Sequence, residues 1–263
     1  MTEISAAMVK ELREATQAGI MDAKRALQET DGDFDEAVKL LRERGMASAA
    51  KRAGRETSEG VVLTFVDEDT GTIVAIGCET EPVSRNEDFE AFAQDVLRAV
   101  HEIGESSVDE LEQRRVELSG RLGENIQIVG ARRMRLHHGE RFASYVHPPA
   151  NKVGVVLRAK GPHELARQLA LHIAFARPSY RSRDQVPADL VTAEREILEK
   201  LPEVQDKPEN VREKIVDGML NKRFYAEAVL GEKAWIHDPA LTVDQALAQG
   251  GLELGDFQWY SVG

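Results

Sequence analysis

Few residues in this chain of 263 could do covalent or metal chemistry. Its single cysteine, Cys78, could act as a nucleophile only with a distant histidine. Its place in a strand pattern indicates a small buried thiol instead. His137, His138 and His147 flank one predicted hairpin, but spacing across a turn is weak support for a metal site. His172 falls near the apolar face of a predicted helix, which is typical of a core histidine with satisfied hydrogen bonds.

Motifs for nucleotide, dinucleotide, metalloprotease and serine hydrolase sites are missing as well. The chain contains no G-x-x-x-x-G-K-[ST], no G-x-G-x-x-G after a strand, no H-E-x-x-H and no G-x-S-x-G. The sequence therefore contains no motif that supports enzyme activity. We expect no cofactor, no metal and no covalent catalysis, and a hydrolase built on Cys78 and a histidine is the least favoured class.

One short segment, CETEPVSRNEDF (residues 78–89), has an order of residues that no structural role requires. Cys78 ends a predicted strand, and Asn86 is a plausible N-cap for the helix that follows. Acidic residues directly after Asn86 suit the positive end of that helix. The residues between, Thr80 to Val83, remain unexplained by structure and are either an ordinary connection or the working part of the protein.

The composition restricts the possible partners and the compartment. With 46 acidic and 34 basic residues the formal charge is −12, which disfavours binding to nucleic acid or to an anionic membrane surface. One cysteine fits a reducing compartment. The N-terminal residues form no apolar leader, and no apolar run is long enough for a transmembrane helix. We therefore expect a soluble cytoplasmic protein.

Residues 1–45 have the pattern of three short helices with one apolar face each. Asp33 with Glu36 resembles a capping box at the third helix, and Gly45 is predicted to end it. Residues 46–60 are predicted to be a connector that carries a small basic cluster. A solvated helix face is the favoured interpretation of that cluster and an RNA contact is the alternative; its members are Lys51, Arg52 and Arg55.

From Val61 onward the pattern changes to an α+β type. A hairpin and a long helix, whose apolar stripe runs from Phe89 to Ile103, occupy residues 61–103, and a hairpin followed by a helix recurs at 141–176. This repeated order of elements predicts two related subdomains with antiparallel sheets, 61–140 and 141–263. Two charged helical segments within 190–223 share a thin apolar seam, which predicts a helical hairpin that projects from the body. A further capping box is predicted at Thr242.

The whole chain also resembles one family. REATQAGIMDAKRALQETDGDFDEAVKLLRERG is similar to the leading segment of the translation elongation factor Ts family, and GMASAAKRAGRETSEG resembles its connector. GCETEPVSRNEDF falls where the family carries Thr-Asp-Phe-Val-Ala-(Lys/Arg)-Asn. LALHIAFARPSY, VDGMLNKRFYAEAVL and the Thr242-Val243 helix follow in family order, so the resemblance covers nearly all of the chain.

This resemblance implies a fold and a function. The fold would be a ubiquitin-associated-like three-helix domain, then two related α+β subdomains with a helical coiled-coil hairpin. The function would be guanine nucleotide exchange on elongation factor Tu during translation elongation, with no covalent catalysis. The partner would be elongation factor Tu, in a complex that could be of higher order.

The resemblance also assigns roles to residues. Displacement of the partner's Mg²⁺ would fall on the segment after the first hairpin, namely Thr80, Glu81, Pro82 and Val83. Contacts to the partner would be made by Arg13, Ile20, Met21, Arg85, Asn86 and His147. The region of His172 is a further candidate in the second subdomain.

Two departures from the family motif affect that assignment. Glu81 stands where the family usually has aspartate, and Pro82 where it usually has phenylalanine, so the aromatic wedge is missing. Pro82 fixes its own φ and is expected to hold Glu81 extended, leaving Val83 a larger share of the contact. Gln17 and Ile20 are smaller departures. The alternative function is therefore a binding or chaperone-like partner of elongation factor Tu with weak exchange activity.

Overall fold

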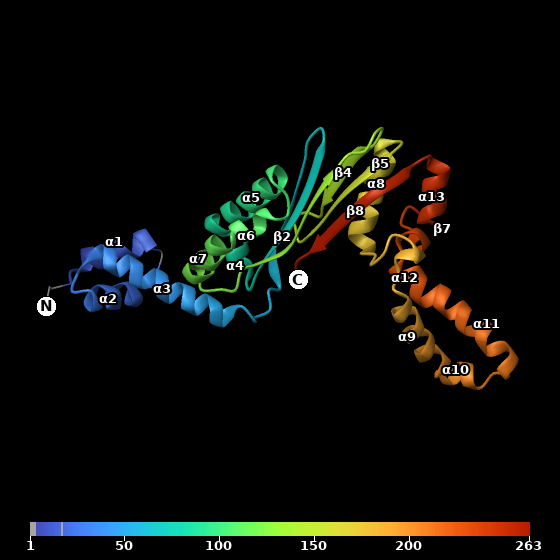
Figure 1. The fold of residues 1–263 in the computed structure, drawn as a ribbon, viewed down its shortest axis with the longest axis horizontal. Coiled ribbons are helices and arrows are strands. Elements are labelled where there is room, and N and C mark those ends of the chain that lie inside the picture. Colours follow the sequence, from blue (N-terminus) through green and yellow to red (C-terminus); the bar gives the residue numbers. More distant parts are fainter. Residues whose placement is uncertain (1–3, 17) are drawn as a thin grey trace. The chain divides into compact units, whose positions relative to one another are not determined.

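The computed structural model describes residues 4–16 and 18–263, and the departure at Gln17 lies outside them. The chain mixes helices with small antiparallel sheets, as predicted (Figure 1). It divides into two units. The first comprises Met1–Arg135, Val146–Gly154 and Tyr260–Gly263, and the second comprises Leu136–Tyr145 and Val155–Trp259. The boundaries that the sequence suggested at 45, 60 and 140 stay a prediction.

Three helices begin the first unit, with the bounds α1 (Ala6–Thr16), α2 (Ile20–Glu29) and α3 (Phe34–Arg52). Their apolar faces meet in a small core that includes Leu12, Ala23 and Leu27. The predicted Asp33 cap is confirmed, because its carboxylate accepts a hydrogen bond from the backbone N–H of Glu36. A bundle of this size buries little apolar surface, so close packing at each of these positions matters for its stability.

Gly45 does not end the third helix, contrary to the prediction. α3 continues to Arg52 and packs against α7 (Glu112–Leu122). A Cβ atom on Gly120 of α7 would lie only 2.7 Å from the backbone of Gly45. The two glycines therefore allow two helix backbones to cross closely, and Gly45 lies at that crossing within α3 and does not end the helix.

The first sheet has the order β1-β2-β3, with the bounds β1 (Glu59–Val66), β2 (Thr70–Cys78) and β3 (Gln127–Arg135). Helix α5 (Glu87–Glu102) lies along it (Figure 1) and buries the predicted stripe from Phe89 to Val100 against β2. Ile103, the last member of the predicted stripe, is exposed because it lies beyond the end of the helix. Between α5 and β3 the chain forms α6 (Ser107–Glu110) and α7, separated at Leu111.

A second sheet has the order β4-β5-β8, with the bounds β4 (Arg141–Val146), β5 (Val153–Lys160) and β8 (Glu253–Ser261). Helix α8 (His163–Ala176) follows β5 and repeats the hairpin–helix order of the first unit. A short ladder pairs β6 (Ala234–Trp235) with β7 (Asp238–Thr242). The capping box at Thr242 of α13 (Val243–Gly250) is confirmed.

The predicted helical hairpin is present in the second unit. Helix α9 (Ala188–Glu199) packs against α11 (Glu209–Met219) around Leu198 and Val216, and α10 (Pro202–Gln205) lies at the turn between them (Figure 1). The second helix does not stay α-helical to 223 as predicted, because a π-helix, Leu220–Tyr225, follows α11. The remaining short helices are α12 (Ala226–Ala228) and two 3₁₀ turns, Arg183–Gln185 and Leu230–Glu232.

Candidate functional site around helix α4

The unexplained segment after β2 is a single helical turn, α4 (Glu81–Ser84). Pro82 is tolerated there because the first N–H groups of a helix have no intrahelical partner, so its missing N–H costs no bond. The extended residue is Thr80, with φ −129° and ψ 151°, whereas Glu81 is already helical. The prediction that Pro82 holds Glu81 extended is therefore wrong, because Glu81 is the first residue of the helical turn.

Both ends of the turn are fixed by hydrogen bonds. At its start, the N–H of Glu79, the N–H of Thr80 and the hydroxyl of Thr80 all donate to the carboxylate of Glu124. At its end, Asn86 caps α5 by accepting a hydrogen bond from the N–H of Asp88, as predicted. The turn is thus held between the last residue of a buried strand and the first turn of a buried helix.

Glu124 was not foreseen as part of this site. The sequence did contain a usable signal, because β2 and β3 are antiparallel neighbours and Gly77 pairs with Gln127. Residues just before β3 must then lie beside residues just after β2. Gly123, with φ 78°, ends α7 in the left-handed region and directs the chain to that edge of the sheet.

The side chains of the turn face different surroundings. Thr80, Glu81 and Pro82 are exposed, whereas Val83 is half-buried and packs against the core beneath α5. Glu81 forms an exposed ion pair of 2.5 Å with Arg85. Pro82 is therefore the most accessible apolar group of the turn, and the larger contact expected of Val83 stays a prediction.

A second segment of the first unit lies beside α4. Glu81 and Arg85 share the lining of a cavity of about 150 Å³ with Asn151 and Lys152, which follow the predicted contact residue His147. His147 itself is exposed, and its backbone closes the turn by accepting a hydrogen bond from the N–H of Asn151. The structure thus brings the segments of Glu81 and His147, distant in the sequence, to one surface.

The other predicted contact residues belong to the N-terminal helices. Ile20 and Met21 are each 60% exposed at the start of α2, and Arg13 is exposed near the end of α1. Large apolar side chains this exposed, with an arginine close by in the sequence, are the kind of group that protein interfaces use. They are presented by a packed bundle and do not take part in its core.

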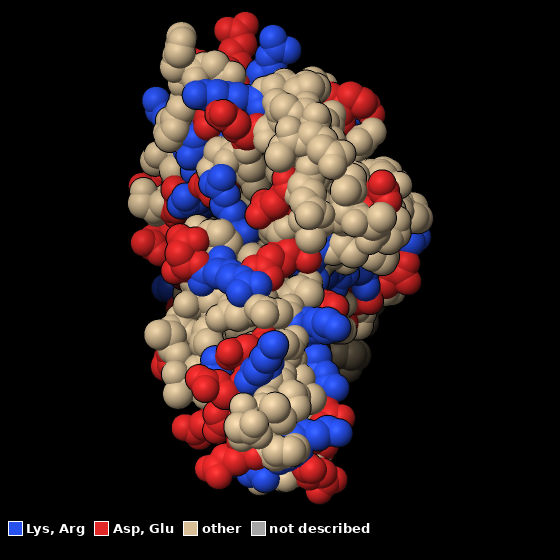
Figure 2. Space-filling view, turned by 90° about the vertical axis from the view of Figure 1, so that its right-hand side faces the viewer, with Lys and Arg blue, Asp and Glu red and all other residues tan. Residues whose placement is uncertain are grey.

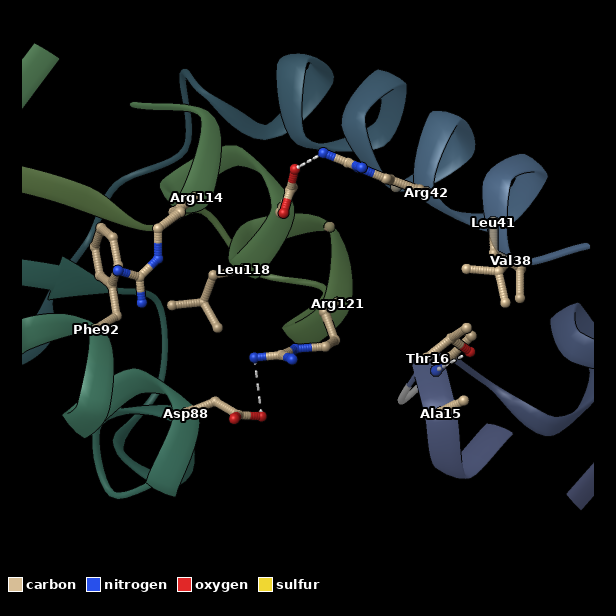
Figure 3. Close-up of a pocket in the computed structure, with 14 residues that line it drawn as sticks. Ala15, Thr16, Val38, Leu41, Arg42, Asp88, Phe92, Arg114, Leu118 and Arg121 are labelled. Atoms are coloured by element: carbon tan, nitrogen blue, oxygen red, sulfur yellow. Dashed lines mark hydrogen bonds and ion pairs between the residues drawn. The ribbon is translucent and has the colours of Figure 1, made fainter. Parts of the chain in front are cut away.

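A larger cavity, of about 400 Å³, contains none of the predicted site residues (Figure 3). Its charged side chains already have partners: Arg121 pairs with Asp88 at 3.0 Å, and Arg42 pairs with Glu117. Figure 3 shows Arg121 pointing from α7 toward Asp88 at the start of α5. These pairs join helices to one another and leave little charge to recognise a ligand.

Cys78 and His172 are buried groups whose pKa values are strongly shifted. Burial raises the pKa of Cys78 to about 12, with the charges of Glu124 and Glu59 adding to the effect. Burial also lowers the pKa of His172 to about 4, helped by the charges of Lys233 and His237. His172 was predicted to be a satisfied core histidine. Its burial is confirmed, but only Nδ1 has a partner among the described residues.

Two further observations concern the charged side chains on the surface and the apolar character of the helices. Figure 2 shows lysine and arginine side chains interspersed with aspartate and glutamate over the face that it presents. Within residues 4–16 and 18–263, no helix combines the length and the apolar character needed to cross a bilayer.

Comparison with known proteins gives one consistent result. The family model described as Elongation factor TS matches residues 79–263. The protein named Elongation factor Ts of Sodalis glossinidius (strain morsitans) is 38% identical over 270 residues, covering 100% of this chain and 93% of that protein. The proteins of the same name of Idiomarina loihiensis and Shewanella amazonensis are 37% and 38% identical, each covering 99% of this chain and 91% of their own length.

Proposed function

This chain belongs to the elongation factor Ts family, and from that premise we propose that its α4 turn acts on the magnesium and phosphate site of elongation factor Tu. Proteins of this family are the guanine nucleotide exchange factors for elongation factor Tu in translation elongation. The observation that carries the proposal is the turn itself, which presents Thr80, Glu81 and Pro82 to solvent while hydrogen bonds fix its backbone.

Exchange by binding follows from thermodynamic linkage. If the exchange factor binds best to the nucleotide-free form of its partner, each ligand weakens the affinity of the other by the same factor. Moving such a balance from 1:99 to 99:1 takes about 5.5 kcal/mol of differential binding. A broad interface can supply this, so no residue of this chain needs to form a covalent bond.

Glu81 has the chemistry for the decisive contact. Mg²⁺ prefers oxygen ligands in strict octahedral geometry, so an intruding carboxylate disturbs the ion's shell and adds negative charge beside the phosphates. Among the described residues, Glu81 pairs with Arg85; both side chains are exposed, and such surface pairs are worth about 1 kcal/mol or less. The carboxylate can therefore exchange Arg85 for the partner's site at small cost.

The remaining contacts extend over three elements of the first unit. We assign partner binding to Arg13, Ile20 and Met21 on the N-terminal helices, to Arg85 and Asn86 beside α4, and to His147. Ile20 and Met21 have the largest exposed apolar side chains in this set. The side-chain oxygen of Asn86 accepts the hydrogen bond that caps α5, and its amide NH₂ group is available to donate to the partner.

A second function is favoured by one observation. Pro82 is exposed at the position where the family usually has phenylalanine, so the turn offers a short apolar group in place of an aromatic ring. A chain of this kind could hold nucleotide-free elongation factor Tu as a binding or chaperone-like partner while exchanging slowly. Either function places the protein in the cytoplasm, where translation elongation occurs.

Release of a fluorescent GDP from elongation factor Tu tests the exchange function. Catalytic amounts of this chain should accelerate release, and Glu81→Ala should lower the rate at least about tenfold, or about 1.4 kcal/mol. The matched control is Glu68→Ala, another exposed glutamate of the same unit in the turn between β1 and β2. An unchanged release rate with the wild-type chain overturns the proposal, and a stable one-to-one complex without turnover would select the second function.

A further inference from the structure

We propose that Glu124 is a positioning residue for nucleotide exchange: its carboxylate holds Thr80 and so sets the place of the α4 turn. The inference rests on the proposed function of that turn. Glu124 touches neither the nucleotide nor the metal in this scheme, and it acts through the residues that do.

The carboxylate of Glu124 accepts three hydrogen bonds from the start of the turn. Its Oε2 atom lies 3.0 Å from the backbone nitrogens of both Glu79 and Thr80, and its Oε1 atom lies 2.5 Å from the hydroxyl of Thr80. Hydrogen bonds to an ionised carboxylate are stronger than those between neutral groups. One side chain therefore restrains two consecutive residues that lead directly into α4.

All polar atoms of Thr80 are used in this arrangement. Its N–H and O–H donate to Glu124, and its carbonyl oxygen accepts from the N–H of Ser84 at 3.2 Å and from the thiol of Cys78 at 3.4 Å. Threonine before a helix commonly caps the helix with its hydroxyl, but here the hydroxyl makes no such cap. Its single donor is directed to Glu124 instead.

The contact is reciprocal, which ties it to the body of the first unit. Oε1 of Glu79 accepts a hydrogen bond of 2.7 Å from the N–H of Asn125. The side chain of Asn125 is buried and donates to the carbonyl of Arg55, also at 2.7 Å. Glu124 is itself held where α7 ends, because its carbonyl accepts a hydrogen bond from the hydroxyl of Ser119. Residues 79–80 and 124–125 thus form a polar clamp across the edge of the first sheet.

Exposure separates a positioning role from a stabilising one. Thr80 is exposed and Glu124 is only half-buried, so water can satisfy the donors if the carboxylate is lost. Loss of stability should then be small, whereas the orientation of Glu81 and Pro82 should no longer be fixed. Misplacement by about 1 Å can lower a rate by a factor of about 100 when geometry is critical.

Glu124→Gln tests the role with two readouts. We expect the maximal rate of GDP release at saturating exchange factor to fall about tenfold, while the concentration giving half of that rate changes less than about twofold, because binding surfaces elsewhere are intact. We also expect faster hydrogen exchange at the amides of Glu79 and Thr80. The control is Glu112→Gln on the adjacent helix α7, where the glutamate pairs locally with Arg115 and not with the turn.

The outcomes distinguish this inference from the proposed function. If the wild-type chain releases no GDP, the function fails, and the amide exchange still decides whether Glu124 holds the turn. If the wild type is active and Glu124→Gln keeps its maximal rate, the positioning role is overturned. An equal loss in Glu112→Gln overturns it as well. If Glu124→Gln does not fold, Thr80→Val removes only the hydroxyl bond to Glu124, and an unchanged maximal rate in that variant overturns the inference.

Discussion

The end of β2 in the first unit and the middle of α8 in the second each bury one group that can titrate, yet the two regions treat it differently. At the end of β2 the thiol of Cys78 donates to the carbonyl of Thr80, and Thr80 is bonded in turn to Glu124. In α8 the ring of His172 accepts one hydrogen bond at Nδ1, from the N–H of Ile236, and its Nε2 atom has no partner among the described residues.

The difference shows what full hydrogen bonding achieves. A buried donor without a partner keeps its desolvation cost, of about 1–3 kcal/mol, whereas a partnered one largely recovers it. Burial, helped by the charges of Lys233 and His237, favours the neutral ring of His172, which packs against Trp235 at 5.0 Å between ring centroids. The junction at Cys78 should therefore be indifferent to pH near neutrality, and the region of His172 should weaken in acid.

The largest expected effect concerns the reactivity of Cys78. Because the pKa of the thiol is raised from 9.0 to about 12, the thiolate fraction at pH 8 is about a thousandfold smaller than in the unfolded chain. Alkylation by iodoacetamide, followed by mass spectrometry, should be slower in the folded protein by at least that factor. The rate should still rise with pH through pH 10, and a plateau near pH 9 would show that the thiol is not protected.

The next effect is acid sensitivity at His172. Its folded-state pKa of about 4 lies below the ordinary value of 6.5, so the unfolded chain takes up a proton first as the pH falls. Stability is unaffected above pH 6.5, declines between pH 6.5 and 4, and has lost about 2 kcal/mol at pH 5. Urea unfolding of the second unit at pH 7 and pH 5 should show this loss in the wild type.

His172→Gln keeps a side-chain acceptor for the N–H of Ile236 and cannot titrate, so it should abolish most of the difference between pH 7 and pH 5. His138→Gln removes an exposed histidine from the same unit and should leave the difference unchanged. Equal pH dependence in His172→Gln and the wild type would remove the contrast between the two regions.

Features that depend on residues close together in the sequence could be predicted. The apolar stripe of α5 and the caps at Asp33, Asn86 and Thr242 depend on neighbours within one or two helical turns, and the structure confirms them. Burial of Cys78 and His172 followed from their place in apolar patterns. The missing partner of Nε2 could not be foreseen, because it depends on which side chains from β6 and its surroundings reach the ring.

Long-range contacts account for the remaining errors. Gly45 was taken for a helix stop because nothing local shows that Gly120 approaches it across a helix crossing. Glu124 was missed because it is separated from Thr80 by more than forty residues, and only the pairing of β2 with β3 brings them together. Pro82 led to a different error. Its local preference for an extended preceding residue predicted an extended Glu81, but Glu81 is the first residue of the helical turn α4.

The smallest expected effect concerns Pro82. It distinguishes the rigidity that proline gives to the α4 turn from the apolar contact area of its side chain. Proline at a compatible helical position stabilises a protein by about 0.4–1 kcal/mol through the unfolded chain, so Pro82→Ala and Pro82→Phe should both lower stability by about that amount. Only Pro82→Phe restores an exposed aromatic ring, and we expect it alone to raise the maximal rate of GDP release severalfold over the wild type. If both variants release GDP more slowly than the wild type, the fixed geometry set by Thr80 and Glu124 matters more than the ring, and proline is then part of the same clamp.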